Sequence, residues 1–321
     1  MTVRPVVVTG ASGFVGRALT WDLTNRGTPV RALSRGPVRA DQQGPISLER
    51  IAVDYGDDVA LARAFAGAGS VVHLVALTHT RRSPRGDDMD AYRAVNVELT
   101  KRVLETAIRA NVRTFVLLSS IKAVGDASAP GDALTERHVR APTDAYGRSK
   151  AEAEDLVLEV AATAGMRTVI LRPPIIHGPG ARGNLLSLMR AARWRVPLPF
   201  GLARNERSTI GLSNLSDVVM AAIDAEGRGG VYHIADDGTM STRMLYERIL
   251  VAMGHRPWLP RVPTAALRIA ATALGRADDI ERLLGDLVVD CALFRTAFDW
   301  TPTTPTNESL DAMVAAYLRV R

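Results

Sequence analysis

The fold class of this 321-residue chain is decided by the stretch Val6-Val7-Val8-Thr9-Gly10-Ala11-Ser12-Gly13-Phe14-Val15-Gly16. Its valine run predicts a buried strand, its glycines stand three residues apart, and a helical spacing follows. In such a strand–turn–helix, glycines permit a tight turn and let the backbone approach a pyrophosphate, which meets the free amides of the helix start. The stretch therefore predicts a dinucleotide site formed by Gly10, Ser12, Gly13, Phe14, Val15 and Gly16.

Strand-like and helical stretches alternate through the first two thirds of the chain. The predicted strands are Val6–Val8, Val30–Leu33, Ile51–Val53, Val71–Val75, Thr114–Leu118, Thr168–Leu171 and Val231–Ile234. The predicted helices are Phe14–Arg26, Val59–Ala66, Ala91–Ala110 and Ala145–Ala162. Several strands are apolar almost throughout, which is typical of strands covered on both faces. The alternation predicts an α/β fold with a Rossmann-type, doubly wound parallel sheet.

The alternation weakens in residues 173–208, which are rich in glycine and proline and are interpreted as irregular. Helices separated by proline breaks are predicted between Ser241 and Arg295. We therefore expect residues 1–172, with about 209–238, to form an NAD(P)-binding domain. Residues 173–208 and 239–321 are expected to form a smaller, mostly helical, substrate-binding lobe.

Composition narrows the classes of protein and of site. Apolar residues make up 47% of the chain, but no run of them is long enough to cross a bilayer, so no stable membrane insertion is expected. The N-terminus shows no signal-peptide pattern, and a cytoplasmic location is expected. A single cysteine excludes an internal disulfide and a cysteine zinc cluster, and no metal site is predicted. The net charge of +6 comes without a basic block, which favours an anionic small molecule over nucleic acid as partner.

The end of the second predicted strand bears on the choice of dinucleotide. NAD sites usually carry an acidic residue there for the ribose 2′-hydroxyl, whereas an arginine suits the 2′-phosphate of NADP. Here the strand ends on Ser34-Arg35, and a guanidinium can bind phosphate oxygens through two hydrogen bonds. NADP is therefore slightly favoured over NAD, with an ordinary surface arginine as the alternative. Asp54, after the third strand, is assigned either to the adenine amine or to a solvated loop.

Tyr146 and Lys150 form the predicted catalytic pair. They open a predicted helix one turn apart and so share one of its faces. A phenol titrates at about pH 10, and a neighbouring ammonium in a dry site is expected to lower that pKa. Lysine occurs only at positions 101, 122 and 150 in this arginine-rich chain, which makes Lys150 notable. The pair indicates proton transfer to or from a substrate oxygen.

These motifs together resemble the extended short-chain dehydrogenase/reductases, and among them the nucleotide-sugar epimerase/dehydratase branch. The glycine turn and the Tyr-x-x-x-Lys pair carry the resemblance, which covers nearly the whole chain. By this resemblance Ser120, in preference to Ser119, bonds the substrate oxygen, and Asn96 supports Lys150 through water. Tyr146 and Lys150 also border the cofactor in this family.

The same resemblance assigns further residues to cofactor and substrate. Pro173 lies in the segment that closes over the nicotinamide, where His177 replaces the usual tyrosine. Asn184 and Arg207 match residues that contact the diphosphate of a nucleotide sugar, a role that suits a bidentate guanidinium. The substrate-binding residues implied are Ser120, Tyr146, Asn184 and Arg207.

Two reactions at carbon 4 of a UDP-hexose or UDP-N-acetylhexosamine fit these residues. In a 4-keto-sugar reductase, Tyr146 gives a proton to the keto oxygen while hydride reaches the carbon. In a 4-epimerase with tightly bound NAD, Tyr146 takes the hydroxyl proton and later returns it. The leaning towards NADP places the reductase slightly ahead. Ile121-Lys122 stands where dehydratases have an Asp-Glu pair, so dehydration is not expected.

Two alternatives come from other classes. A 3β-hydroxysteroid-type dehydrogenase shares the same motifs, and the apolar stretch Ala265–Leu274 suits a lipid pocket or a membrane contact. Core or lid packing is nevertheless the favoured interpretation of that stretch. The other alternative is a non-catalytic NADP(H) sensor, which would not need Tyr146, Lys150 and Ser120.

The resemblance also implies a homodimer. Relatives pair through a four-helix bundle, which here would use the predicted helices Ala91–Ala110 and Ala145–Ala162. Val103 and Leu156 are candidate contact residues on those helices.

Overall fold

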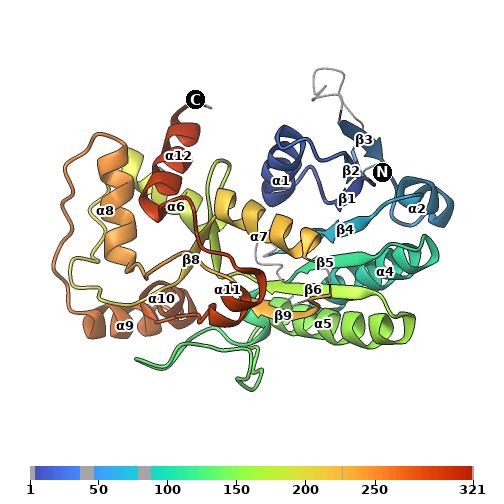
Figure 1. The fold of residues 1–321 in the computed structure, drawn as a ribbon. Helices are drawn as coiled ribbons and strands as arrows, with labels where there is room; N and C mark the ends of the chain where they lie inside the picture. Colours follow the sequence, from blue (N-terminus) through green and yellow to red (C-terminus); the bar gives the residue numbers. More distant parts are fainter. Residues whose placement is uncertain (1–3, 37–46, 79–87, 226, 320–321) are drawn as a thin grey trace.

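The computed structural model describes residues 4–36, 47–78, 88–225 and 227–319. Seven strands form one parallel sheet in the order β3-β2-β1-β4-β5-β6-β9 (Figure 1). Their bounds are β1 Val6–Thr9, β2 Val30–Ser34, β3 Leu48–Ala52, β4 Ser70–His73, β5 Thr114–Leu118, β6 Arg167–Arg172 and β9 Gly230–His233. The strand order reverses its direction beside β1, so the predicted doubly wound parallel sheet is confirmed.

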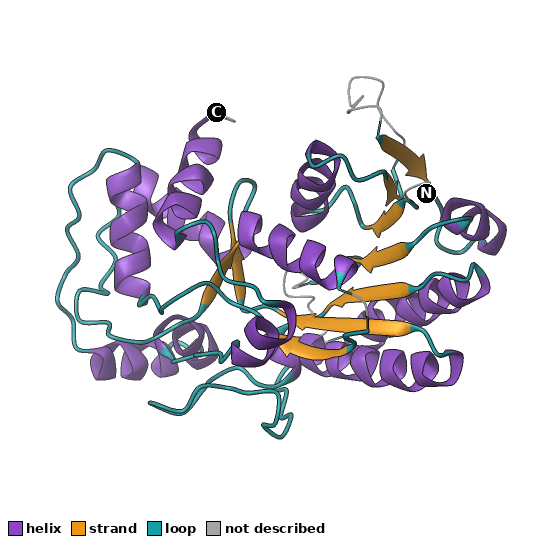
Figure 2. Ribbon diagram, viewed as in Figure 1, coloured by secondary structure: helices purple, strands orange, loops and turns teal. Residues whose placement is uncertain are grey.

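Helices cover both faces of this sheet (Figure 2). One face packs against α1 (Phe14–Asn25) and α7 (Leu212–Asp224), and the other against α2 (Asp58–Phe65), α4 (Leu99–Arg109) and α5 (Ala145–Ala164). Strand β1 shows why its sequence is apolar throughout. Val6 and Val8 join the first of these layers and Val7 joins the second, and all three are buried.

The predicted helix Ala91–Ala110 is divided into three parts. The chain forms α3 (Met89–Arg93), a π-helical turn at Ala94–Glu98 and then α4. Such π turns are rare and are frequently found at functional sites. This one carries Asn96, which is only 1% exposed. The turn thereby directs an amide side chain into the interior next to α5.

The second lobe lies beside the carboxyl ends of the strands (Figure 1). A two-stranded parallel sheet pairs β7 (Ile175–His177), from a segment predicted for the lobe, with β8 (Thr209–Gly211), from a segment predicted for the dinucleotide domain. The further helices are α6 (Gly183–Arg193), α8 (Thr242–Ala252), α9 (Thr264–Ala273), α10 (Ala277–Leu284), α11 (Ala292–Phe298) and α12 (Thr306–Arg319). The interpretation of residues 173–208 as irregular was wrong, because β7 and α6 lie there. Leu185, Leu188 and Ala192 give α6 a buried face, which the surrounding glycines and prolines obscured in the sequence.

Burial contradicts two interpretations of apolar residues. Helix α9 covers most of Ala265–Leu274, and none of its residues is fully buried; Leu267 packs half-buried on a small apolar cluster, but most of the stretch is not core packing. Val103 is fully buried against the sheet and is not available to a partner chain. Periodicity marks an apolar helix face but does not say what covers it. Within the described ranges, every helix is too short or too polar to cross a bilayer.

Asn214 of α7 ties the sheet layer to the C-terminal segment. Its side chain is 0% exposed, and its Nδ2 donates to Asp236 Oδ1 at 2.7 Å and to the Thr304 carbonyl at 2.9 Å. Its Oδ1 accepts from the amides of Thr303 at 3.1 Å and Thr304 at 3.0 Å. All four hydrogen-bonding positions of the amide are therefore used.

We expect Asn214→Ala to lower the free energy of unfolding by about 2–4 kcal/mol, because it leaves several buried polar groups without partners. Urea denaturation measures this change. The exposed neighbour Ser213 offers a matched control, and Ser213→Ala should change the free energy by less than about 0.5 kcal/mol. Equal changes of the free energy of unfolding in the two variants would contradict the role assigned to the Asn214 hydrogen bonds.

Candidate active site

The glycine turn between β1 and α1 has no room for side chains. Gly10 has a φ of +71°, and a Cβ on it would lie 3.0 Å from the Val75 amide nitrogen. A Cβ on Gly16 would lie 2.3 Å from the Gly10 carbonyl oxygen, so α1 packs directly on the turn. Gly13 caps α1 without a side chain, which leaves the first amides of the helix to other partners. This bare helix start fits a dinucleotide pyrophosphate.

Tyr55 fixes the position of the glycine turn. Its hydroxyl accepts a hydrogen bond from the Gly10 amide at 3.0 Å and donates one to the Leu33 carbonyl at 3.3 Å. Burial raises the pKa of Tyr55 to about 12. The bridge joins the turn to the end of β2. Sequence reasoning missed Tyr55, whose one signal is an aromatic residue directly after Asp54 at the end of a strand.

The predicted residues for the adenosine half of the cofactor lie near this turn, at the ends of β2 and β3. Ser34 closes β2, and its hydroxyl donates to the Gly36 carbonyl at 3.4 Å. Arg35 is exposed. The exposed Asp54 accepts a hydrogen bond from the Gly56 amide at 2.9 Å. The roles of Ser34, Arg35 and Asp54 towards a cofactor stay predictions.

The three predicted reacting side chains meet at the carboxyl end of β5. Tyr146 and Lys150 lie in the first two turns of α5. Ser120 follows β5, and its hydroxyl is hydrogen-bonded to the Tyr146 phenol. Lys150 is 2% exposed and donates to the Leu118 carbonyl at 2.7 Å. The neighbouring Ser119 hydroxyl donates instead to the buried Glu154 carboxylate.

Burial governs the titration of this pair. It raises the pKa of Tyr146 to about 12, against the hydrogen bond from Ser120, which lowers it. Burial also lowers the pKa of Lys150 to about 8, and the charge of Glu154 opposes that change. The net pKa of the phenol is raised and not lowered, because burial, Asp144 and Tyr92 together outweigh the Ser120 hydrogen bond, and a lowering by Lys150 stays a prediction. At neutral pH the chain holds a phenol with a proton to give, beside an ammonium.

Asn96 connects the loop after β4 to α5. Its Oδ1 accepts from the Leu77 amide at 2.7 Å, and its Nδ2 donates to the Leu77 carbonyl at 3.1 Å and to Ser149 Oγ at 2.9 Å. Ser149 Oγ in turn donates to the Tyr146 carbonyl at 2.8 Å. Asn96 thus reaches the catalytic helix through Ser149, and its support of Lys150 through water stays a prediction.

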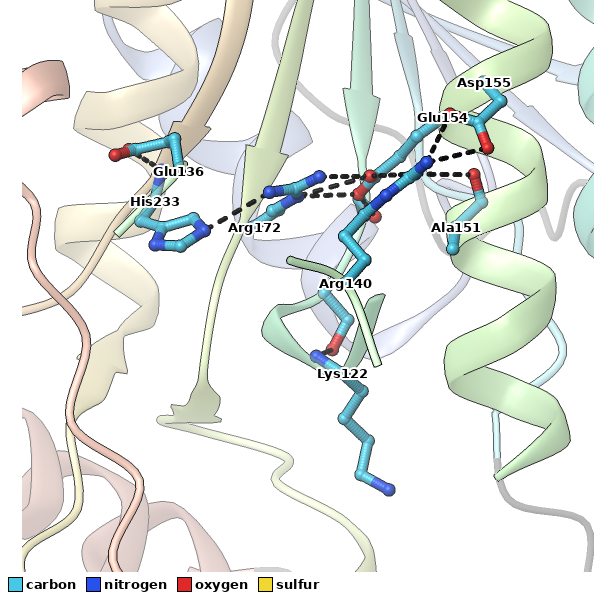
Figure 3. Close-up of polar contacts among 10 residues, drawn as sticks. Lys122, Glu136, Arg140, Ala151, Glu154, Asp155, Arg172 and His233 are labelled. Carbon is cyan, nitrogen blue, oxygen red and sulfur yellow. Dashed lines mark hydrogen bonds and ion pairs between the residues drawn. The ribbon is translucent and has the colours of Figure 1, made fainter. Parts of the chain in front are cut away.

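Glu154 lies at the centre of a buried ionic network, which Figure 3 shows. Its side chain is 0% exposed, and it accepts from the Ser119 hydroxyl and from Arg172, with Nη2 at 2.6 Å and Nε at 3.0 Å. Arg140 approaches from the other side, with Nη1 3.5 Å from Oε2. Arg172 Nη1 lies 3.4 Å from His233 Nε2. The network joins β5, α5, β6 and β9, and sequence reasoning missed it because its members are far apart in the chain.

A second cluster of charges lies at the start of α5. The Asp144 carboxylate caps this helix by accepting from the Gly147 amide at 2.7 Å, and it pairs with the Lys122 ammonium. Lys122 Nζ also lies 2.6 Å from Asp126 Oδ1. Arg282 of α10 lies 3.9 Å from the same Asp144 carboxylate. The cluster places a helix of the lobe beside the catalytic helix.

The predicted substrate residues lie in the lobe. Asn184 is exposed in the first turn of α6, which has no side-chain cap. Arg207 Nη1 donates to the Gly285 carbonyl at 2.9 Å, and its Nε is buried without a hydrogen-bond partner in the described part of the chain. Burial lowers the pKa of Arg207, while Asp126 and Asp286 oppose this change.

The segment after β6 is held against the catalytic edge of the sheet. The Pro173 carbonyl accepts from the Ile121 amide at 2.9 Å, one residue beyond Ser120. His177 is 1% exposed, and its Nε2 lies 3.3 Å from Asp236 Oδ2. His177 therefore faces a buried carboxylate.

The family model described as the NAD dependent epimerase/dehydratase family matches residues 6–235. The chain belongs to this family. The matched range contains the glycine turn, Ser120, Tyr146 and Lys150. The protein is therefore an NAD(P)-dependent enzyme of the extended short-chain dehydrogenase/reductase type.

Individual relatives of this epimerase/dehydratase family member differ in reaction. The chain is 30% identical to a UDP-glucose 4-epimerase of Vibrio cholerae over 319 residues, which are 98% of this chain and 96% of that protein. It is also 30% identical over 266 residues to a 4-hydroxy-2-methyl-3-oxo-4-farnesyl-3,4-dihydroquinoline-1-oxide ketoreductase of Stigmatella aurantiaca, at 82% and 78% coverage. The solved structure of MoeE5 in complex with UDP-glucose and NAD superposes with a TM-score of 0.79 at 26% identity, covering 98% of this chain and 99% of that one.

We expect Tyr55→Phe to weaken the binding of NAD. The Gly10 amide loses its hydrogen-bond acceptor, and the glycine turn loses the side chain that holds it in position. The free energy of unfolding should fall by about 1–3 kcal/mol. Calorimetric titration with NAD and urea denaturation measure the two effects. Tyr246→Phe is a matched control, since it removes a buried hydrogen bond to the Val196 carbonyl in the lobe. It should reduce stability but leave NAD affinity unchanged, and a loss of affinity in both variants would refute the anchoring role.

The three lysines of the chain make Lys150 directly observable. In the NMR spectrum of protein with isotope-labelled lysine, one of three side-chain signals should titrate near pH 8. Glu154→Gln should move that titration to lower pH, because the ammonium loses a stabilising negative charge. Asp155→Asn removes an exposed carboxylate from the same helix and should leave it in place. An unchanged Lys150 titration in Glu154→Gln would contradict the coupling.

Proposed function

We propose that this protein is a 4-epimerase of a UDP-hexose and that it keeps NAD bound through the reaction cycle. The observation that carries the proposal is the match to a UDP-glucose 4-epimerase along almost the full length of both chains. A match confined to the dinucleotide domain would support the cofactor alone, whereas this match includes the substrate lobe. The sequence by itself places a 4-keto-sugar reductase slightly ahead, and the full-length match reverses that order.

The chain supplies the proton transfer of the proposed reaction. NAD, when bound at the glycine turn, accepts hydride from carbon 4 of the sugar and returns it. Tyr146 takes the hydroxyl proton at that carbon and gives it back, and Ser120, hydrogen-bonded to the phenol, orients the same oxygen. Lys150, one turn along the helix, contributes the positive charge that favours a phenolate during the transfer. Asn96 and Ser149 hold the turn of α5 that carries Tyr146.

We assign the diphosphate of the substrate to Arg207 and the start of α6. The buried Nε of Arg207 is a donor without a partner among the described residues, and a guanidinium suits phosphate oxygens. The uncapped first turn of α6 adds the Asn184 amide and backbone amides. Asp126 and Asp286 near Arg207 oppose its loss of charge, so the guanidinium stays cationic for an anionic substrate.

A 4-keto-sugar reductase using NADP(H) is the second candidate. The observation that favours it is the end of β2, where Ser34 and the exposed Arg35 stand in place of a carboxylate. The steroid dehydrogenase alternative gave Ala265–Leu274 a lipid pocket or a membrane contact; α9 exposes this stretch at the surface, which does not fit a pocket wall and leaves the membrane contact.

Mass spectrometry of the nucleotide released from heat-denatured protein separates these candidates. The epimerase proposal predicts NAD in about equimolar amount and conversion of UDP-glucose to UDP-galactose, followed by NMR, without added cofactor. A protein that is released without nucleotide, exchanges NADPH freely and reduces a 4-keto sugar would instead establish the reductase.

Tyr146→Phe should abolish interconversion, by at least about a thousandfold in kcat, because the substitution removes the hydroxyl that carries the proton in the proposed reaction. The amount of bound NAD should not change. The partner ring Tyr92, 6.2 Å away between ring centres, provides the control Tyr92→Phe, which should keep most of the activity. Full activity in Tyr146→Phe would refute the mechanism.

A further inference from the structure

Two segments of the lobe form one surface that is unusual in composition. Residues 193–205 and 254–276 are joined by a hydrogen bond from the Gly201 amide to the Pro260 carbonyl at 3.0 Å. Their inward-facing residues share one small apolar cluster with α10. Together the two segments contain no aspartate or glutamate and seven arginines, namely Arg193, Arg195, Arg204, Arg256, Arg261, Arg268 and Arg276. We call these two segments the basic apolar surface.

Large apolar side chains point outward from the same two segments. Trp194 is 77% exposed, Trp258 69%, Ile269 72% and Leu274 75%. The outer face of α9 consists mainly of alanine around Ile269, and no residue of this helix is buried. Single exposed apolar residues are ordinary, but two tryptophans and an apolar helix face on two adjoining segments without acidic residues indicate a binding role.

The positive charge of this surface is largely free. Arg268 pairs with Glu281 at 2.7 Å and Arg276 pairs with Asp279 at 3.0 Å, both on or beside α10. The other five arginines are exposed and have no ion pair within the described ranges of the chain. The surface therefore attracts a partner with negative charge spread over a plane rather than with a single acidic group.

A second copy of the chain does not fit this surface. A symmetric dimer would bring the patch against itself, and the unpaired arginines of the two copies would repel one another. Indoles, aliphatic side chains and arginines are instead the combination that binds the interfacial region of a lipid bilayer.

We propose that the basic apolar surface docks this enzyme on an anionic phospholipid bilayer. Trp194, Trp258 and the outer face of α9 enter the headgroup region, while the unpaired arginines bind lipid phosphates. Arg282 of the adjacent α10 reaches Asp144 at the start of the catalytic helix, so the lipid-bound face is one helix away from the active site. Docking therefore holds the substrate lobe towards the membrane without any membrane-spanning segment.

Sedimentation with vesicles tests this proposal on the full chain, without need of turnover. Vesicles of phosphatidylcholine with phosphatidylglycerol should bind the protein at least about tenfold more tightly than vesicles of phosphatidylcholine alone, and high salt should weaken the binding. The variants Ile269→Asp with Leu274→Asp, and Arg256→Glu with Arg261→Glu, should each lose at least about tenfold in affinity.

A matched control lies on α2, at the opposite end of the molecule from α9 (Figure 1). Val59 is 61% exposed and Arg63 is also exposed, so Val59→Asp with Arg63→Glu makes the same chemical change elsewhere. This control should bind vesicles as the unaltered protein does. Circular dichroism and thermal unfolding confirm that every variant remains folded, and a control that loses binding equally would overturn the assignment of the surface.

Three further results would overturn the proposal. The first is equal binding to neutral and anionic vesicles, or no binding to either. The second is a change of oligomeric state in Ile269→Asp, measured by light scattering, since that would show a second copy on this face. The third is tighter binding of an oligonucleotide than of anionic vesicles, lost in Arg256→Glu with Arg261→Glu but kept in Ile269→Asp with Leu274→Asp.

Discussion

The Glu154 carboxylate is fully buried, and it accepts hydrogen bonds from the Arg172 guanidinium and the Ser119 hydroxyl. A buried carboxylate without such partners is very costly, so α5 must meet the ends of β5 and β6 in one register. That register also places Ser120 at the Tyr146 phenol. Apolar side chains of similar size would pack as well in this position. We infer that the network contributes mainly to the uniqueness of the arrangement and less to net stability.

The parallel sheet explains why several side chains of the candidate active site depend on the register of α5 against β5 and β6. Its strands all end at the same edge, where the glycine turn follows β1, Ser120 follows β5 and Pro173 follows β6. Cofactor and substrate groups far apart in the sequence therefore become neighbours without long loops. The lobe adds its own contact at that edge, through Arg282 beside Asp144.

The features that could be predicted from the sequence are those whose residues lie close together in the chain. The glycine turn and the Tyr146–Lys150 spacing each lie within one short segment, and the sheet follows from the alternation of buried strands with helices. The Tyr55 bridge to Gly10 and the Glu154 network were not predicted, because their partners are separated by many residues and nothing in either segment marks the pairing. The exposed α9 was misjudged for a related reason, since apolar spacing describes one face of a helix and not its surroundings.

Ser120 and burial act in opposite directions on the pKa of the Tyr146 phenol. The Ser120 oxygen accepts from the Lys122 amide at 3.2 Å, and the hydrogen bond between Ser120 and Tyr146 lowers the pKa of the phenol. Burial raises the same pKa to about 12, so the proton is not lost to water near neutral pH. In the proposed reaction, transfer in either direction then needs a substrate oxygen beside Tyr146, and the Lys150 ammonium, whose pKa burial lowers to about 8, is the proposed source of positive charge.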